Sequence, residues 1–217
     1  MDDLAARFQT LDTTSVSDAL DRLGLVGGLL GLKPLAPHTG RVICGQAFTV
    51  RYRPCGAVKG TVGDFLDDVP AGQVIVLDNG GRDYCTVWGD IMSLVARSNK
   101  VAGTIIDGVC RDVSEIVRIG YPVFSKGHYM VTGKDRVEVE TVNSPVSVSG
   151  VEVRPLDFIL ADDSGALVIP QASAAEVLAA ALEIAETERR IIEDVQQGVS
   201  LRASRSKHNY HHLQTKA

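Results

Sequence analysis

A short apolar run at residues 101–106, with a helical pattern on each side, limits the possible folds of this chain more than any other segment. The run is rich in β-branched residues and ends at Asp107-Gly108, so it predicts a buried strand followed by a tight turn. Before the run, Gly89-Asp90 opens a pattern with apolar residues at helical spacing, and after it Ser114 begins another. The expected order is therefore helix, buried strand, turn and helix.

Two charged residues follow the predicted strand, at the position where open α/β sheets usually bind ligands. Arg111 carries a rigid fork that can hold a carboxylate at two points, and Asp112 and Glu115 offer hard oxygen ligands for Mg²⁺ or Mn²⁺. Free N–H groups at the start of the helix at Asp90 could bind an anion. The combination suggests a site for a small keto acid, although an Arg-Asp pair after a strand is more often a surface ion pair or a helix start.

These residues also resemble the signature of a known family. The pattern Gly89-Asp90, Asp107-Gly108 and Arg111-Asp112-x-x-Glu115 is similar to that of the class II pyruvate aldolases acting on 4-hydroxy-4-methyl-2-oxoglutarate and 4-carboxy-4-hydroxy-2-oxoadipate. Their close relatives are the regulators of ribonuclease E activity. Further similar blocks extend the resemblance over most of the chain, at residues 14–20, 45–50, 120–124 and 157–170. It is more specific for the superfamily than for a substrate.

The resemblance implies the fold class and the domain organisation. The expected fold is a compact α/β sandwich of mixed β-sheets flanked by helices, similar to the swivelling β/β/α (phosphohistidine-like) domains. Residues 1–170 would form the aldolase-like core, and residues 171–217 a C-terminal helix and tail that pack on a neighbouring subunit. Family members form trimeric rings that often pair into hexamers, so a homotrimer or homohexamer is expected.

The resemblance also implies roles for individual residues in a metal-dependent lyase that releases pyruvate and decarboxylates oxaloacetate. Arg111 would hold the pyruvyl end of the substrate, supported by the start of the preceding helix at Gly89, Asp90, Ile91 and Met92. Asp112 would bind Mg²⁺ or Mn²⁺ directly, and Glu115 through water. The motif contains no lysine suited to a Schiff base, which favours a metal mechanism. The general base is not evident from the sequence.

A second hypothesis is a non-catalytic inhibitor of ribonuclease E. Such inhibitors typically lack the acidic residue that Glu115 supplies, and they end near the last core strand, whereas this chain continues through a helical pattern at residues 174–197. In the aldolases this helix provides a glutamate to a neighbouring subunit's site. Glu188 is the candidate for that catalytic residue, with Glu186 as the alternative. The enzyme hypothesis is therefore favoured.

Composition indicates an ordinary globular chain of 217 residues. With 22 basic and 27 acidic side chains the net charge is −5, which argues mildly against a nucleic-acid partner. No apolar run approaches the ~18 residues of a membrane span, and the acidic N-terminus does not resemble a signal peptide. We therefore expect a cytoplasmic protein without membrane association, whose four scattered cysteines are reduced thiols.

The remaining pattern predicts helices at residues 3–11 and 16–23, the second one capped within residues 13–15, and strands at residues 40–53 and 73–78. Residues 79–83 are expected to form a turn. Alternating strands up to residue 169 suggest an antiparallel region with a hairpin turn at residues 162–165.

A few other polar residues have two interpretations in the sequence alone. Asp78 and Asp83 could bind a metal, but strand-end and loop carboxylates are commoner. His128 could act as an acid–base group or be structural, and the tail histidines His208, His211 and His212 could bind a metal or simply be solvated. The contacts that choose the substrate's C4 group are not evident, with Arg53, Lys59 and Lys126 as candidates.

Overall fold

The structure is a computed structural model that describes residues 2–36, 41–57 and 59–210. Its centre is one mixed sheet of eight strands in which β1, β5, β4, β3, β2, β9 and β10 lie side by side in that order, and β6 also pairs with β2. The strand bounds are β1 (Lys33–Pro34), β2 (Ile43–Pro54), β3 (Val74–Thr86), β4 (Gly103–Cys110), β5 (Val123–His128), β6 (Val137–Val142), β9 (Phe158–Asp162) and β10 (Gly165–Ile169). A separate hairpin is formed by β7 (Val146–Val148) and β8 (Val151–Val153).

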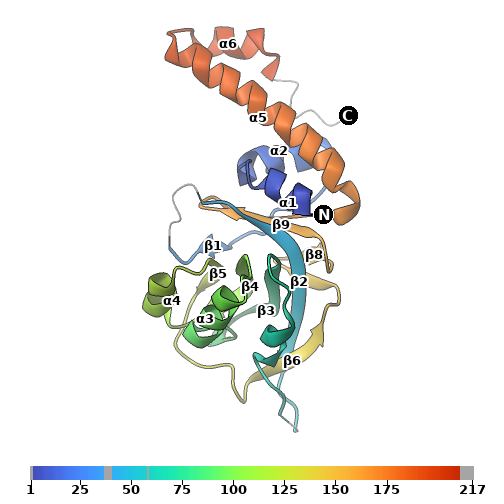
Figure 1. Ribbon diagram of the computed structural model, residues 1–217, viewed down its shortest axis with the longest axis vertical. Helices are drawn as coiled ribbons and strands as arrows, with labels where there is room; N and C mark the ends of the chain where they lie inside the picture. Colours follow the sequence, from blue (N-terminus) through green and yellow to red (C-terminus); the bar gives the residue numbers. More distant parts are fainter. Residues whose placement is uncertain (1, 37–40, 58, 211–217) are drawn as a thin grey trace.

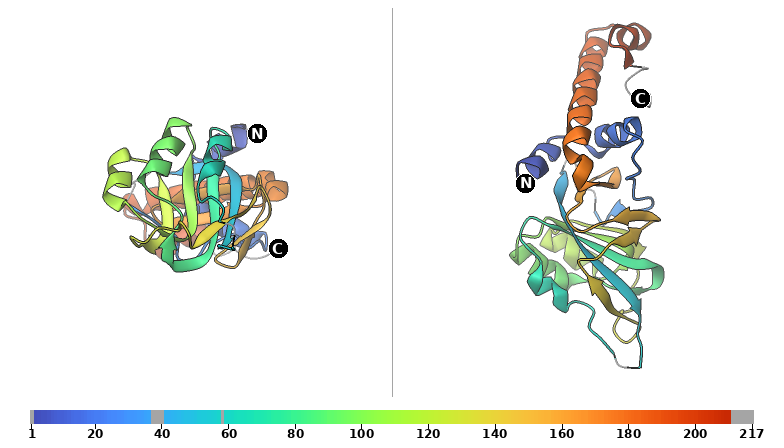
Figure 2. Two further views of the ribbon diagram at one scale, coloured as in Figure 1. Left: turned by 90° about the horizontal axis from the view of Figure 1, so that it is seen from below. Right: turned by 90° about the vertical axis from the view of Figure 1, so that its right-hand side faces the viewer.

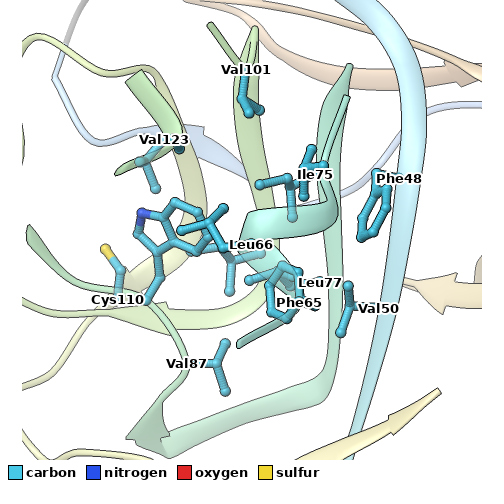
Figure 3. Packing of buried hydrophobic residues seen from close by; sticks show 14 of the residues in the cluster. Phe48, Val50, Phe65, Leu66, Ile75, Leu77, Val87, Val101, Cys110 and Val123 are labelled. Atoms are coloured by element: carbon cyan, nitrogen blue, oxygen red, sulfur yellow. The ribbon is translucent and has the colours of Figure 1, made fainter. Parts of the chain in front are cut away.

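The parallel strands β2 to β5 form the core of the sheet and are buried on both faces. Alternate side chains point to opposite faces, so Ile75 and Leu77 join one apolar cluster while Val74 and Val76 join another. The first cluster is covered by α3 (Asp90–Ser98), α4 (Val113–Ile119) and the 3₁₀ turn η1 (Asp64–Asp68). Part of that cluster appears in Figure 3. The second lies beneath β7, β8, β9 and β10.

A third apolar cluster lies outside β9 and β10. It is formed by α1 (Asp2–Phe8), α2 (Thr13–Arg22) and the first half of α5 (Ala174–Gln196), whose buried residues include Val177, Ala181 and Ile184. The far end of α5 extends beyond α1 and α2, and α6 (Leu201–Lys207) packs against α5, so the molecule is elongated (Figures 1 and 2). The fold is therefore the expected α/β architecture with a C-terminal helical extension.

Two expected turns are instead irregular stretches of strand. Residues 79–83 do not end β3, which runs on to Thr86 through left-handed residues Gly80 (φ 60°) and Gly81 (φ 67°). Asp107-Gly108 likewise lies inside β4, and the pairing between β3 and β4 shifts register at both places. Glycine marks β-bulges as well as turns, and the sequence pattern did not distinguish the two.

Other expectations are confirmed with small corrections. Residues 162–165 form the β9–β10 hairpin, in which Asp162 Oδ1 accepts the N–H of Ser164 at 2.8 Å. The cap of α2 is Asp12 rather than a residue within 13–15, because Asp12 Oδ1 accepts the N–H of Ser15. His208 pairs with Asp194 between α6 and α5, while residues 211 and 212 lie outside the described residues. In the described part of the chain, no helix is both long and apolar enough to cross a bilayer.

Candidate active site

The candidate site lies where β4 is followed by α4. Past the end of β4 at Cys110, Arg111 donates its backbone N–H to the carbonyl of Trp88 at 3.1 Å, which brings the segments ahead of α3 and α4 together. Trp88 is buried, and its indole N–H donates to Ser93 Oγ at 2.8 Å. Asp112 has a left-handed backbone (φ 57°, ψ 36°), and α4 begins after it. The Arg111 and Asp112 side chains stay about one-third exposed (39% and 34%).

The Asp112 carboxylate rests against the N-terminus of α3. Its Oδ2 accepts the N–H of Asp90 at 3.3 Å and lies 3.1 Å from Nε of Arg111. Gly89 approaches so closely that a Cβ added there would lie 2.5 Å from the same oxygen. Because Gly89 has an ordinary extended backbone (φ −155°), this close approach is what requires glycine. The structure therefore brings Gly89, Asp90, Arg111 and Asp112 together, as the motif predicts.

Gly89→Ala should reduce activity while leaving the fold nearly intact. The added methyl group would displace the flexible carboxylate of Asp112 rather than backbone, so we expect a change in the free energy of unfolding of less than about 1 kcal/mol. The catalytic rate at this site should fall by at least about tenfold, since misplacing a reacting group by ~1 Å can cost about 10²-fold. Gly28→Ala is a matched control, because a Cβ at Gly28 meets nothing within 4 Å. Equal activities of the two variants would contradict this role for Gly89.

A cavity of about 400 Å³ adjoins this cluster. One wall is the start of α3, with Gly89, Asp90, Ile91 and Met92, and Arg111 lies beside it. The lining also includes Thr132 and Lys134, which the sequence analysis did not single out. Lys134 belongs to no recognisable motif, and only the return of the chain across the sheet ends places it near Arg111. The cavity therefore combines two cationic side chains with a helix N-terminus, an arrangement suited to carboxylates.

Residues 60–64 form the third wall of this cavity and are held by buried groups. Glu138, 3% exposed on β6, accepts the Gly60 N–H at 2.7 Å and the Nε–H of Arg53 at 3.0 Å. The Gly60 N–H, aided by Arg53, keeps the pKa of the Glu138 carboxyl below its ordinary value. Tyr52 donates its hydroxyl to the Val62 carbonyl at 2.6 Å. Arg53 thus supports a wall of the cavity rather than lining it.

A second cavity, of about 340 Å³, lies on the other side of Arg111. It is lined by Arg111, Asp112, Val113, His128, Tyr129 and Met130. His128 is the last residue of β5 and is exposed, so it borders the candidate site instead of being a buried structural histidine.

Glu115 and Asp78, two other candidate ligands, bind groups of the chain itself. Glu115 pairs with Arg118 one turn along α4 (Oε2 to Nε 2.9 Å), and this contact lowers the pKa of its carboxyl. Asp78 accepts the N–H groups of Gly80 and Ser147, which corresponds to the commoner, structural interpretation of a strand-end carboxylate.

Two of the lysines considered for substrate contacts also have acidic partners. Lys126 Nζ lies 2.5 Å from Oδ1 of buried Asp107, and Lys59 Nζ lies 2.9 Å from Oδ1 of Asp135. Neither lysine lines the two cavities beside Arg111. Lys134 is therefore the better lysine candidate.

Glu188 does not meet Asp112 within one chain. It lies on α5, which extends away from the sheet on the side of β9, α1 and α2, whereas α4 lies beside α3 against the sheet (Figure 1). Burial, together with the nearby carboxylates of Asp18 and Asp12, raises the pKa of Glu188. Glu186 instead accepts from Arg189 and Arg190, which lower its pKa to about 2. Of the two glutamates, Glu188 is thus the one with no ion pair to the described residues and with the higher proton affinity.

Comparison with known proteins finds relatives that match most of this chain. It is 40% identical to Protein DlpA of Legionella pneumophila over 97% of its own length, but it spans only 34% of that protein, about one third. A protein of Halalkalibacterium halodurans named "Putative 4-hydroxy-4-methyl-2-oxoglutarate aldolase" is 31% identical, with 81% of this chain and 80% of that one covered. A crystal structure of an uncharacterized protein from Pseudomonas syringae superposes with a TM-score of 0.87 at 41% identity, covering 94% and 98% of the two chains. A family model described as RraA-like, Aldolase/RraA, matches residues 13–168, and the chain therefore belongs to the RraA-like family.

Proposed function

We propose that this chain is a carbon–carbon lyase that releases pyruvate by retro-aldol cleavage of a 4-hydroxy-2-oxo diacid, with a divalent metal ion, and that it also decarboxylates oxaloacetate. The observation that carries the proposal is the meeting of Arg111, Asp112 and the N-terminus of α3 at one cavity. The names of relatives as aldolases support the same class of reaction.

The acidic residues of this site, Asp112 and Glu115, suit a metal ion that keeps most of its water ligands. Of the two carboxylate oxygens of Asp112, Oδ2 alone has hydrogen-bond or ion-pair partners among the described residues. Oδ1 is therefore left for direct coordination of a metal ion. No group of three or more His, Cys, Asp or Glu suited to a metal occurs in the described part of one chain. Mg²⁺ commonly uses one or two carboxylates and several waters, so it suits such a site. Glu115 would hold one of those waters at the expense of its exposed, weak ion pair with Arg118.

The chain's own groups would bind and orient the diacid. The guanidinium of Arg111 would bind the C1 carboxylate, and Lys134 would add a second positive charge across the cavity. The N–H of Ile91 now donates to Asp90 Oδ1 at 2.7 Å, so a substrate carboxylate would replace that side chain as its acceptor. A bound divalent ion would act as a Lewis acid and stabilise the negative charge left on the 2-keto oxygen when the C3–C4 bond breaks.

The proton on the 4-hydroxyl must be accepted by a further group, and we assign this role to Glu188 of a neighbouring subunit, acting directly or through water. Its raised pKa suits a proton acceptor better than the low pKa of Glu186 does. The outer half of α5 carries exposed apolar residues, including Ile192 and Val195, which a neighbouring subunit of a homotrimer or homohexamer would cover.

Arg111→Lys should lower kcat/KM by roughly 10²-fold, on the order of 3 kcal/mol, because lysine keeps the charge but loses the two-point grip on a carboxylate. Steady-state kinetics of pyruvate release would measure the effect. Arg118→Lys is the matched control, since Arg118 is exposed and pairs only with Glu115 among the described residues. A loss of less than about threefold for Arg111→Lys would mean that this arginine is structural.

A coupled assay of pyruvate release tests the function itself. The panel contains oxaloacetate and several 4-hydroxy-2-oxo acids, each measured with Mg²⁺, with Mn²⁺ and with excess chelator. We expect metal-dependent pyruvate release that chelation abolishes and added metal restores. Full activity in excess chelator would exclude the metal mechanism. No release from any compound would contradict the lyase proposal.

A further inference from the structure

One wall of the cavity of about 400 Å³ (the first cavity) is held in place by side chains from two strands. Residues 60–64 form this wall, and residues 60–63 belong to no helix or strand, so their backbone groups need partners in neighbouring elements. Oε2 of Glu138, on β6, accepts the Gly60 N–H at 2.7 Å. Tyr52, on β2, donates its hydroxyl to the Val62 carbonyl at 2.6 Å. The position of the wall therefore depends on side chains that lie behind it.

Glu138 leaves the wall little freedom to move. It is only 3% exposed, and its other carboxylate oxygen, Oε1, accepts the Nε–H of Arg53 at 3.0 Å. A buried carboxylate is costly unless it is paired, and here both oxygens have partners. A Cβ added at Gly60 would lie 3.1 Å from both Cβ and Oε2 of Glu138, so glycine permits this close approach. The wall is thus hydrogen-bonded to Glu138 and packed tightly against it.

The wall in turn packs against the start of α3. A Cβ added at Gly63 would lie 3.2 Å from both Sδ and Cε of Met92. Met92 lines the first cavity, and Arg111 borders the same cavity. A displacement of the wall away from Glu138 would therefore change both the packing of Met92 and the width of the cavity in which a carboxylate would bind.

We propose that Glu138 is a positioning residue, which holds residues 60–64 against Met92 and thereby sets the affinity of the first cavity for a 2-oxo acid. This inference rests on the proposed function and adds to it a residue outside the motif around Arg111. Glu138 does not line the cavity and acts through the Gly60 N–H. Because binding groups must be held within about 0.5 Å of their productive positions, a small displacement of the wall is enough to weaken binding.

Binding of pyruvate in the presence of Mg²⁺ tests the inference apart from turnover. Trp88 is the single tryptophan of the chain and lines the first cavity, so its fluorescence would report binding. Glu138→Ala should weaken pyruvate binding by at least about fivefold, because the Gly60 N–H loses its acceptor and the wall is released. Glu138→Gln should bind within about twofold of wild type, since an amide oxygen can still accept this N–H.

A substitution in the wall itself separates this contact from a general loss of stability. Gly60→Ala should weaken pyruvate binding by a similar factor, since its Cβ would push the wall away from Glu138. Added to Glu138→Ala, it should cost less than about twofold more, because the wall is then already released. Gly28→Ala is the matched control, as a Cβ there meets nothing within 4 Å. Tyr52→Phe removes the hydrogen bond to Val62 and should also weaken binding, which keeps the test decisive if Glu138→Ala does not fold.

The outcomes distinguish this inference from the proposed function. Unchanged pyruvate binding in folded Glu138→Ala and Gly60→Ala proteins would overturn the inference, as would two effects that multiply in the double variant. Wild-type protein that binds no pyruvate would overturn it as well. The lyase is decided separately by pyruvate release from the substrate panel. Release by wild-type protein would leave the lyase standing whatever the variants bind, and the binding data decide the role of Glu138 even if no compound is cleaved.

Discussion

Asp112→Asn should lower pyruvate release by at least about 10³-fold, equivalent to about 4 kcal/mol of transition-state stabilisation. The amide is neutral and is a much poorer ligand for a divalent cation than the carboxylate it replaces. Asparagine is also among the residues that best tolerate the left-handed backbone found at Asp112 (φ 57°), and it has nearly the same shape beside Gly89. The loss would therefore report on the charge rather than on the fold.

The metal dependence of this variant makes the test specific. Titration with Mg²⁺ or Mn²⁺ should restore the activity of the chelated wild-type protein. The Asp112→Asn variant should stay inactive at every metal concentration. Glu115→Gln is the matched comparison, because Glu115 lies in the first turn of α4 with an exposed ion pair, and its proposed role runs through water. We expect a loss of only about tenfold to 10²-fold there. Substantial activity of Asp112→Asn with metal would refute Asp112 as the direct ligand.

Mixing two inactive variants should restore activity if the site is shared between subunits. Glu188→Gln removes the proposed proton acceptor, and Asp112→Asn removes the proposed metal ligand. Random exchange of equal amounts should leave about a quarter of the sites with both groups intact, since each site takes one residue from each of two subunits in a cyclic oligomer. We expect the mixture to recover roughly that share of wild-type turnover.

Point variants suit this experiment better than removal of the C-terminal helix. The first half of α5 covers an apolar cluster with α1 and α2, so deletion would expose the residues that α5 covers, such as Phe8, Leu20 and Phe158, and destabilise the core. The control experiment uses the Glu186→Gln variant in place of Glu188→Gln. It tests whether the effect depends on which glutamate of α5 is replaced. If subunit exchange is demonstrated by labelled protein and activity stays absent, the shared site is refuted.

Much of the fold could be predicted because its strands carry clear local signals. The β-branched run around Ile105 is buried on both faces as β4, and α3 begins at Asp90. The bulges at Gly80 and Gly108 could not be predicted, because they depend on how β3 and β4 pair rather than on either segment alone. Glycine at such positions has the same local signature as a turn.

The candidate site was predictable only where the motif is contiguous. Arg111 and Asp112 are adjacent, and Gly89 is brought to them by one hydrogen bond from Arg111 to Trp88. Lys134 reaches the same cavity because residues 128–134 cross the sheet ends, a path set by pairing with Thr86. No periodicity in the sequence encodes that path.

The position of β2 has a consequence for how the chain is made. One edge of β2 can pair with β3 soon after synthesis. The other edge stays unpaired until β6 and β9 have been synthesised. The Gln46 side chain, for example, bonds to the Leu156 carbonyl 110 residues later. At ~5–20 residues per second the ribosome leaves this edge unpaired for roughly 5–20 seconds. An apolar strand with open backbone groups is a template for pairing with another chain, so this edge favours mispairing of the nascent protein until β9 emerges.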